Sequence, residues 1–212
     1  LDKKDIDNDI RYQLTYMGEE FLKLIHIYSI YGKINKTLND IISNDLNKDD
    51  ILRYISELNE AFKAHKNVYI KLLNSNSLIE KRVAYHIEGT MLSPLLIHYK
   101  HDSSNIEAMD TIKKFLSYDN EYDSNLYEYF ISKAKSYGVT SSYQPIFSNL
   151  YDIIYNDKSI NQVRDGGGNE KHVNRRLNVW GSGGAHKTYF NKIDNLIINI
   201  FNMPLDKQPI GI

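Results

Sequence analysis

The chain has 212 residues, a formal net charge of −1 and no cysteine, which excludes disulfides, thiolate metal sites and cysteine nucleophiles. With 42% apolar and 25% charged residues, and no run of about 18 apolar residues, it has the composition of a soluble globular chain. The balanced charge predicts neither nucleic acid nor a membrane as a partner. The charged start, residues 2–5, lacks the apolar core of a signal peptide, so we expect a cytoplasmic protein.

Apolar residues recur at intervals of three and four across the first three quarters of the chain, which predicts a mostly α-helical region. One stripe covers residues 14–28 and stops near Gly32, and a short second helix is expected around residues 38–42. Asp49 is placed, with the aspartate that follows it, to cap a long third helix over residues 51–73.

The next helix is predicted from a capping box, in which Ser77 is followed three residues later by Glu80. This helix extends through Met91, and Pro94 is expected to kink or interrupt it. Three more helices are expected over residues 106–116, 126–137 and 146–155. Gly138 stands where a left-handed residue would end the second of these three. No segment here alternates with a period of two, so we expect little strand.

The composition changes after Tyr155. Six of the eleven glycines and the only tryptophan lie between Gly166 and Gly184, where the apolar periodicity is lost. This pattern predicts a loop of about 30 residues. Helical spacing returns over residues 189–201, and residues 210–212 look like the first residues of a strand. A helix and the start of a strand with no sheet to join predict the front part of a larger protein.

Three interpretations of residues 174–188 compete. A phosphate loop would run from Gly181 to Lys187, but His186 stands where the Walker A pattern needs its second glycine. The second interpretation is a binding site for single-stranded nucleic acid, in which an aromatic ring lies beside clustered cations. The cations are Arg164, Lys171, His172, Arg175, Arg176 and Lys187. A cofactor or substrate lid would use backbone flexibility at the glycines, with Trp180 as a stacking surface.

Residues 178–190 (NVWGSGGAHKTYF), an amphipathic helix, and then residues 204–212 (PLDKQPIGI) carry a family resemblance. Together they resemble the entry into class I S-adenosylmethionine-dependent methyltransferases, and most of all the C-methyltransferase domains of modular polyketide synthases. The resemblance covers residues 174–212. It implies a helical lid over residues 1–156, a Gly-rich connector and pocket segment over 157–186, and the first helix and strand start of an α/β Rossmann-like core over 187–212.

The resemblance implies that the intact domain moves a methyl group from S-adenosylmethionine to the α-carbon of an acyl chain on an acyl carrier protein. Its other partners would be the rest of the methyltransferase core and further synthase domains. His186 is the candidate catalytic residue. The candidate cofactor-binding residues are Trp180, Gly181, Gly183, Gly184, Tyr189 and Phe190.

Two alternatives remain open at this point: a noncatalytic helical interaction module that precedes an unrelated domain, and a nucleic-acid-binding segment. His98 and His101 have the spacing of a metal-binding pair. Because no carboxylate lies in register with them, we expect no metal.

Overall fold

The computed structural model describes residues 2–6, 9–43, 47–102, 106–116, 124–160 and 163–210, and every structural statement below concerns these residues. The first half comprises β1 (Asp2–Ile6), β2 (Asp9–Gln13), α1 (Tyr16–Leu22), η1 (Ile25–Tyr28), α2 (Ser29–Ser43), α3 (Lys48–Leu73), α4 (Leu78–His86), η2 (Ile87–Leu92) and α5 (Ser93–Asp102). The second half comprises α6 (Ile106–Leu116), α7 (Ser124–Lys133), η3 (Ala134–Tyr137), α8 (Gly138–Ser142), α9 (Gln144–Ser148), α10 (Leu150–Tyr155), α11 (Arg175–Phe201) and η4 (Leu205–Lys207).

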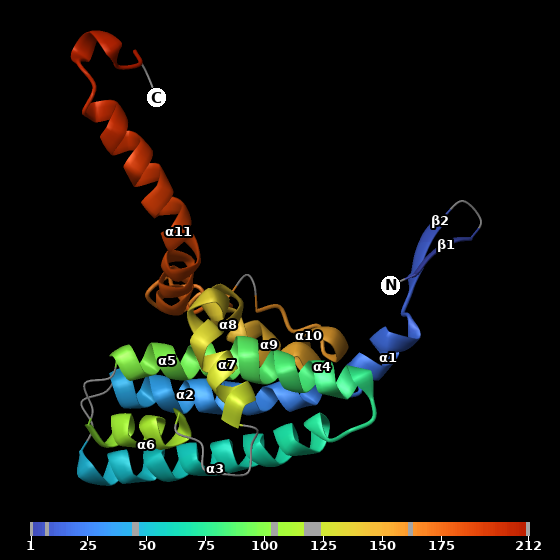
Figure 1. Cartoon of the computed structure of the whole chain (residues 1–212). Helices are drawn as coiled ribbons and strands as arrows, with labels where there is room; N and C mark the ends of the chain where they lie inside the picture. The colour runs from blue at the N-terminus through green and yellow to red at the C-terminus, as the bar shows by residue number, and fades with distance from the viewer. Residues whose placement is uncertain are drawn as a thin grey trace.

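The fold is a bundle of helices from which α11 projects (Figure 1). The long helix α3 lies beside α2, and the α4–η2–α5 segment packs on the same core. Tyr31 and Ile34 of α2, Phe62 of α3, and Met91 and Leu95 of the third segment are buried in it. Burial of each such side chain stabilises the fold by about 1.5–3 kcal/mol relative to exposure. The mostly α prediction is confirmed.

Helix starts follow the predicted capping chemistry with small shifts. The Ser77 hydroxyl accepts a hydrogen bond from the Glu80 amide at 3.4 Å, as expected. The long helix α3 begins earlier than predicted, because Asn47 is its N-cap and accepts a bond from the Asp50 amide at 2.9 Å. Asp49 lies in the first turn, where a negative charge interacts favourably with the helix dipole.

The interruption expected near Pro94 is a π-helical segment, η2, just before it. Pro94 is the second residue of α5, which continues from η2 without a break in helical backbone geometry. Glu88 of η2 is buried, with its Oε2 3.1 Å from Nε2 of His65. Nδ1 of His65 in turn lies 3.2 Å from the hydroxyl of Tyr31, so three connected polar side chains cross the apolar core.

Two predicted glycine breaks are wrong. Helix α2 runs straight through Gly32, where an added Cβ would meet Cβ of Ser148 in α9 at 3.0 Å. Gly138 has a φ of −59° rather than a left-handed conformation, and the chain continues through it into α8. In both places glycine allows another segment to approach closely, and it does not end a helix.

A short antiparallel hairpin, β1–β2, was not predicted. Lys3 pairs with Tyr12 and Asp5 with Ile10. Each strand has only five residues, several of them charged, so an alternating apolar pattern could not show in the sequence. The wider expectation of little strand is confirmed for the described residues, in which this hairpin forms the one sheet.

The predicted loop is shorter than expected, because helix α11 already begins at Arg175. Its N-cap, Asn174, accepts a bond from the Leu177 amide at 3.0 Å, and Leu177 is fully buried. The prediction of a loop over residues 175–186 is therefore wrong. Ile210 lies in a bend, and the other two residues of the expected strand start fall outside the described residues. None of the helices in the described part of the chain is both long and apolar enough to span a bilayer.

Candidate functional site

The Gly-rich part of α11 crosses α8 at backbone-to-backbone distance. A Cβ added to Gly181 would lie 2.4 Å from the amide nitrogen of Val139 and 2.6 Å from Cα of Gly138. Backbone atoms held in a helix cannot move aside as a flexible side chain can. Both crossing positions therefore require glycine, and the tertiary contact outweighs the poor helix propensity of these residues.

Trp180 lies next to this crossing and faces the bundle. Its ring centroid is 5.6 Å from that of His98, and the ammonium of Lys135 lies 6.0 Å from the ring. The indole is partly buried against the core cluster that includes Leu177. Trp180 thus anchors α11 on the bundle. These contacts leave less of the indole ring free than the predicted stacking role requires.

Gly184 also faces the bundle, because an added Cβ there would lie 2.3 Å from Cγ of Lys135. The other predicted residues lie up to three turns further along α11 and face away from the bundle. Gly183 and His186 are exposed, as are Tyr189 at 67% and Phe190 at 54%. The His186 ring lies 6.3 Å from the Tyr189 ring and 5.9 Å from the Phe190 ring, measured between centroids. These three rings form one aromatic surface, while Trp180 points elsewhere. The structure therefore splits the predicted set into two groups.

The far half of α11 projects beyond the bundle (Figure 1), and many of its apolar side chains are exposed. These exposed side chains are Tyr189, Phe190, Ile193, Leu196, Ile198 and Phe201, followed by Met203 and Leu205. Contiguous exposed apolar side chains of this size are typical of interaction surfaces. The sequence predicted an apolar stripe here, and the structure shows that it extends into solvent.

A polar cavity of about 1120 Å³ lies beside the N-terminal end of α11. Helices α2 and α9 form one side, and the connector with Lys158 and Lys171 forms the other. In the described part of the chain, no carboxylate lies within ion-pair distance of Lys36 or Lys171. Asp40 adds a carboxylate to the same lining, so the cavity suits a polar ligand. Sequence reasoning missed it because its residues come from three separated segments and share no local motif.

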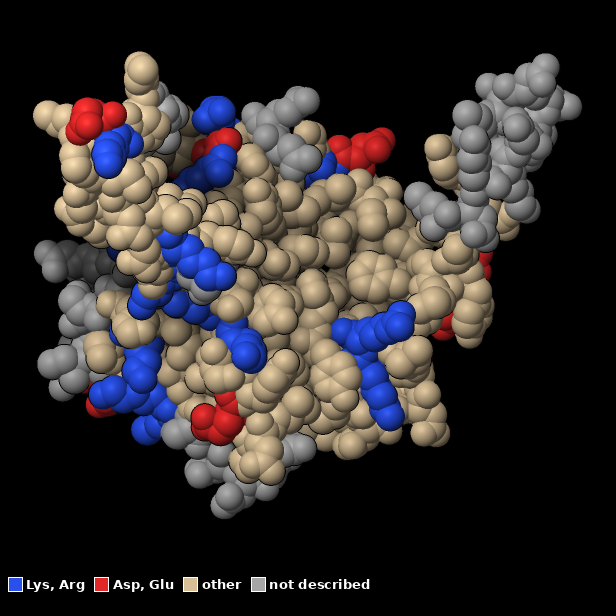
Figure 2. Space-filling view, turned by 45° about the horizontal axis from the view of Figure 1, so that its top comes forward, with Lys and Arg blue, Asp and Glu red and all other residues tan. Residues whose placement is uncertain are grey.

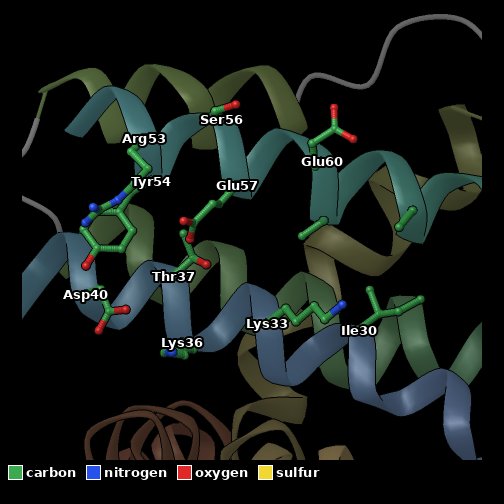
Figure 3. A pocket seen from close by; sticks show the side chains of 12 residues that line it. Ile30, Lys33, Lys36, Thr37, Asp40, Arg53, Tyr54, Ser56, Glu57 and Glu60 are labelled. Atoms are coloured by element: carbon green, nitrogen blue, oxygen red, sulfur yellow. The ribbon is translucent and has the colours of Figure 1, made fainter. Parts of the chain in front are cut away.

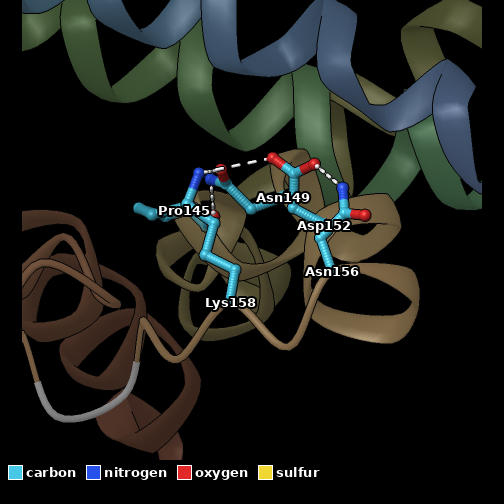
Figure 4. A network of polar contacts seen from close by, with 5 residues as sticks. All are labelled: Pro145, Asn149, Asp152, Asn156 and Lys158. Carbon is cyan, nitrogen blue, oxygen red and sulfur yellow. Dashed lines mark hydrogen bonds and ion pairs between the residues drawn. The ribbon is translucent and has the colours of Figure 1, made fainter.

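A hydrogen-bond network holds the connector against α9 and α10 (Figure 4). The ammonium of Lys158 donates to Oδ1 of Asn149 at 2.6 Å and lies 3.4 Å from Oδ2 of Asp152. Asn149 donates to the carbonyl of Pro145 at 2.7 Å, and Asn156 to Oδ1 of Asp152 at 3.0 Å. This network fixes the wall of the polar cavity.

The connector contains a defined turn around residues 165–169. Oδ1 of Asp165 accepts bonds from the amides of Gly167 at 2.9 Å and Asn169 at 2.8 Å. The side-chain amide of Asn169 also donates to this carboxylate, at 3.0 Å to Oδ2. This side-chain bond, followed by the backbone bonds, holds the pKa of Asp165 below its usual range. Gly168 has a φ of 80°, which favours glycine.

The cations beside α11 are partly neutralised. Oε2 of Glu170 accepts a bond from Nε of Arg175 at 2.6 Å, and Arg164 lies 3.9 Å from the same carboxylate. The hydrogen bond from Arg175 lowers the pKa of Glu170. On the face in Figure 2, most Lys and Arg side chains gather on one half, interrupted by acidic groups. This arrangement gives little support to the nucleic-acid alternative.

A second cavity, of about 800 Å³, runs between α2 and α3 (Figure 3). Lys33 and Lys36 line one side, and Glu57 and Glu60 line the other. Arg53 also lines this cavity, and its guanidinium lies 3.0 Å from Oδ1 of Asp50 in its own helix. Mixed charge of this kind is typical of a solvated seam between two helices.

Residues 170–212 match the family model of the AprA MT2-like domain, a methyltransferase family. A methyltransferase-like domain is therefore indicated. The match covers the end of the connector, α11 and η4, and leaves the helical bundle outside it. A search of curated proteins finds no match to this chain. The family match supports the methyltransferase part of the predicted resemblance.

Proposed function

We propose that the chain contributes the helical lid and the first core helix of an S-adenosylmethionine-dependent C-methyltransferase. Its substrate would be the α-carbon of an acyl chain carried by an acyl carrier protein. The observation that carries the proposal is the family match over residues 170–212, which includes helix α11, and this helix projects from the bundle with its apolar surface uncovered.

The uncovered surface of α11 has the form that a core helix needs. In an α/β fold each helix buries one apolar stripe against a sheet. Ile193, Leu196 and Phe201 are all exposed here, and a sheet packed on them would remove that apolar area from water. The bundle would then lie on one side of α11 and the catalytic core on another, as a lid requires.

The residues fit a bound S-adenosylmethionine in part. The exposed rings of Tyr189 and Phe190 can contact a flat adenine or an acyl thioester, whereas Trp180 is committed to His98 and Lys135. We therefore assign ligand contacts to Tyr189 and Phe190, and assign Trp180 the positioning of α11. When bound, S-adenosylmethionine supplies an electrophilic methyl group.

His186 would act on the acyl substrate. C-methylation needs a group that removes a proton from the α-carbon or stabilises the enolate. The imidazole of His186 is exposed beside Tyr189 and Phe190, so an acyl chain held on those rings would lie within its reach.

The test is methyl transfer by the natural full-length protein, with S-adenosylmethionine and acetyl- or malonyl-loaded carrier protein, followed by mass spectrometry of the carrier-bound acyl group. We expect one or two added methyl groups, and for His186→Gln a fall in turnover of at least tenfold with an unchanged free energy of unfolding. Methylation of oxygen or nitrogen, or His186→Gln with full turnover, would refute the substrate or the assigned role respectively.

A further inference from the structure

A cavity of about 390 Å³ lies between α1, η1, α4 and α9, away from α11. Three aromatic side chains, Phe21, Tyr28 and Phe147, form its walls, together with the imidazole of His86. The lining is predominantly apolar, with a guanidinium, Arg82, among its residues. Volume and lining match those of small-molecule sites, which are about 300–1000 Å³ and carry few polar groups.

The aromatic walls of the cavity pack against one another. The rings of Tyr28 and Phe147 are stacked at 6.0 Å between centroids, and the Phe21 ring is 6.2 Å from the Tyr28 ring. The His86 ring meets the Phe147 ring edge-on at 5.3 Å. Helix α1, which supplies Phe21, has no buried residue of its own. The cavity is therefore bounded on one side by a helix that lies at the surface.

The polar chemistry inside the cavity comes from one hydrogen-bonded pair. The hydroxyl of Tyr28 lies 2.9 Å from Nδ1 of His86. Burial raises the pKa of Tyr28 and lowers the pKa of His86, so the phenol keeps its proton and the imidazole is neutral near pH 7. The hydroxyl then donates to Nδ1, since this pairing satisfies both groups. Nε2 of His86 carries the remaining proton and is the donor left for a ligand.

Arg82 supplies a positive charge with no ion-pair partner in the described part of the chain. Its side chain is exposed, and it lines the same cavity as His86, which lies one helical turn further along α4. A guanidinium presents a planar fork of donors that matches a carboxylate. An unpaired guanidinium beside an aromatic cavity is complementary to a flat apolar group that carries a negative charge.

We propose that this cavity binds a small aromatic carboxylate. The aromatic group lies among Phe21, Tyr28 and Phe147, the carboxylate pairs with Arg82, and Nε2 of His86 donates to a ligand oxygen. The site is separate from α11 and does not depend on methyl transfer.

The test is isothermal titration calorimetry of the 212-residue chain with 2-naphthoate, and with 2-naphthylmethanol as the uncharged analogue. We expect saturable, one-to-one binding of 2-naphthoate, with the dissociation constant in the millimolar range or below. Arg82→Gln should weaken 2-naphthoate about tenfold and leave the alcohol unchanged, because only the carboxylate uses the guanidinium.

Lys81→Gln is the matched control, since Lys81 is the neighbouring cation on the same helix and does not line the cavity. It should leave both affinities unchanged. Ile79→Trp, which fills the cavity from its α4 side, should abolish binding of both compounds, with circular dichroism confirming a folded chain. Absence of saturable 2-naphthoate binding would overturn the proposal. Equal weakening by Arg82→Gln and Lys81→Gln would also overturn it, because it would indicate general charge attraction.

Discussion

Substitution of Gly181 by alanine tests the close crossing of α8 and α11. The new Cβ would lie 2.4 Å from the amide nitrogen of Val139 and 2.5 Å from the carbonyl carbon of Gly138. Ordinary contact needs about 3.4 Å or more, so the two helices must separate by about 1 Å. Overpacking of this kind costs about 1–3 kcal/mol, and we expect the upper part of that range because the opposing atoms are backbone.

Alanine also has a better helix propensity than glycine, by about 1 kcal/mol. The net expectation for Gly181→Ala is therefore a loss of about 1–2 kcal/mol in the free energy of unfolding. Gly183→Ala is the matched control, since a Cβ there meets nothing within 4 Å in the described residues. This variant should gain up to about 1 kcal/mol from propensity alone.

Urea unfolding followed by far-ultraviolet circular dichroism measures both free energies. A third variant, Gly184→Ala, would bring its Cβ to 2.3 Å from Cγ of Lys135, a flexible side chain that can move aside, so it should fall between the other two. If Gly181→Ala proves as stable as Gly183→Ala, the close crossing is not as described and the reasoning fails.

Three further predictions concern buried and exposed groups. Glu88→Ala should lower the free energy of unfolding in urea by about 3 kcal/mol because it removes the partner of Nε2 of the buried His65. Glu88→Gln should cost clearly less because it keeps an acceptor, and equal costs would contradict this. Burial lowers the pKa of His86, so the unfolded chain binds more protons and stability is lost as pH falls below about 6.5. His86→Phe should flatten this dependence between pH 7.5 and 5.5, and an unchanged slope would count against it. Trp180→Ala should lower the free energy of unfolding by about 2 kcal/mol because the indole packs on the core. Tyr189→Phe should change the same free energy by less than about 0.5 kcal/mol because Tyr189 is exposed in this chain. The reverse order of the two effects would refute the role of Trp180 as the anchor of α11.

Local patterns in the sequence predicted most of the helices. Apolar spacing and capping residues depend on neighbours within about four positions, so the start of α4 at Ser77 and the span of α6 over residues 106–116 follow from the sequence alone. The apolar stripe on the far half of α11 was predicted for the same reason.

The role of each glycine was decided by tertiary structure. The sequence predicted the end of a helix at Gly32, a C-terminal cap at Gly138 and a loop at Gly181. In the structure, each of these glycines lies where a segment distant in the chain comes too close for a Cβ. The seven candidate site residues were adjacent in the sequence, but a continuous helix turns Trp180 toward the bundle and His186 away from it. The aromatic cavity around His86 combines four elements that no local pattern connects. Periodicity is a property of one helix, whereas packing depends on what lies across from it, and that is set only when the chain folds.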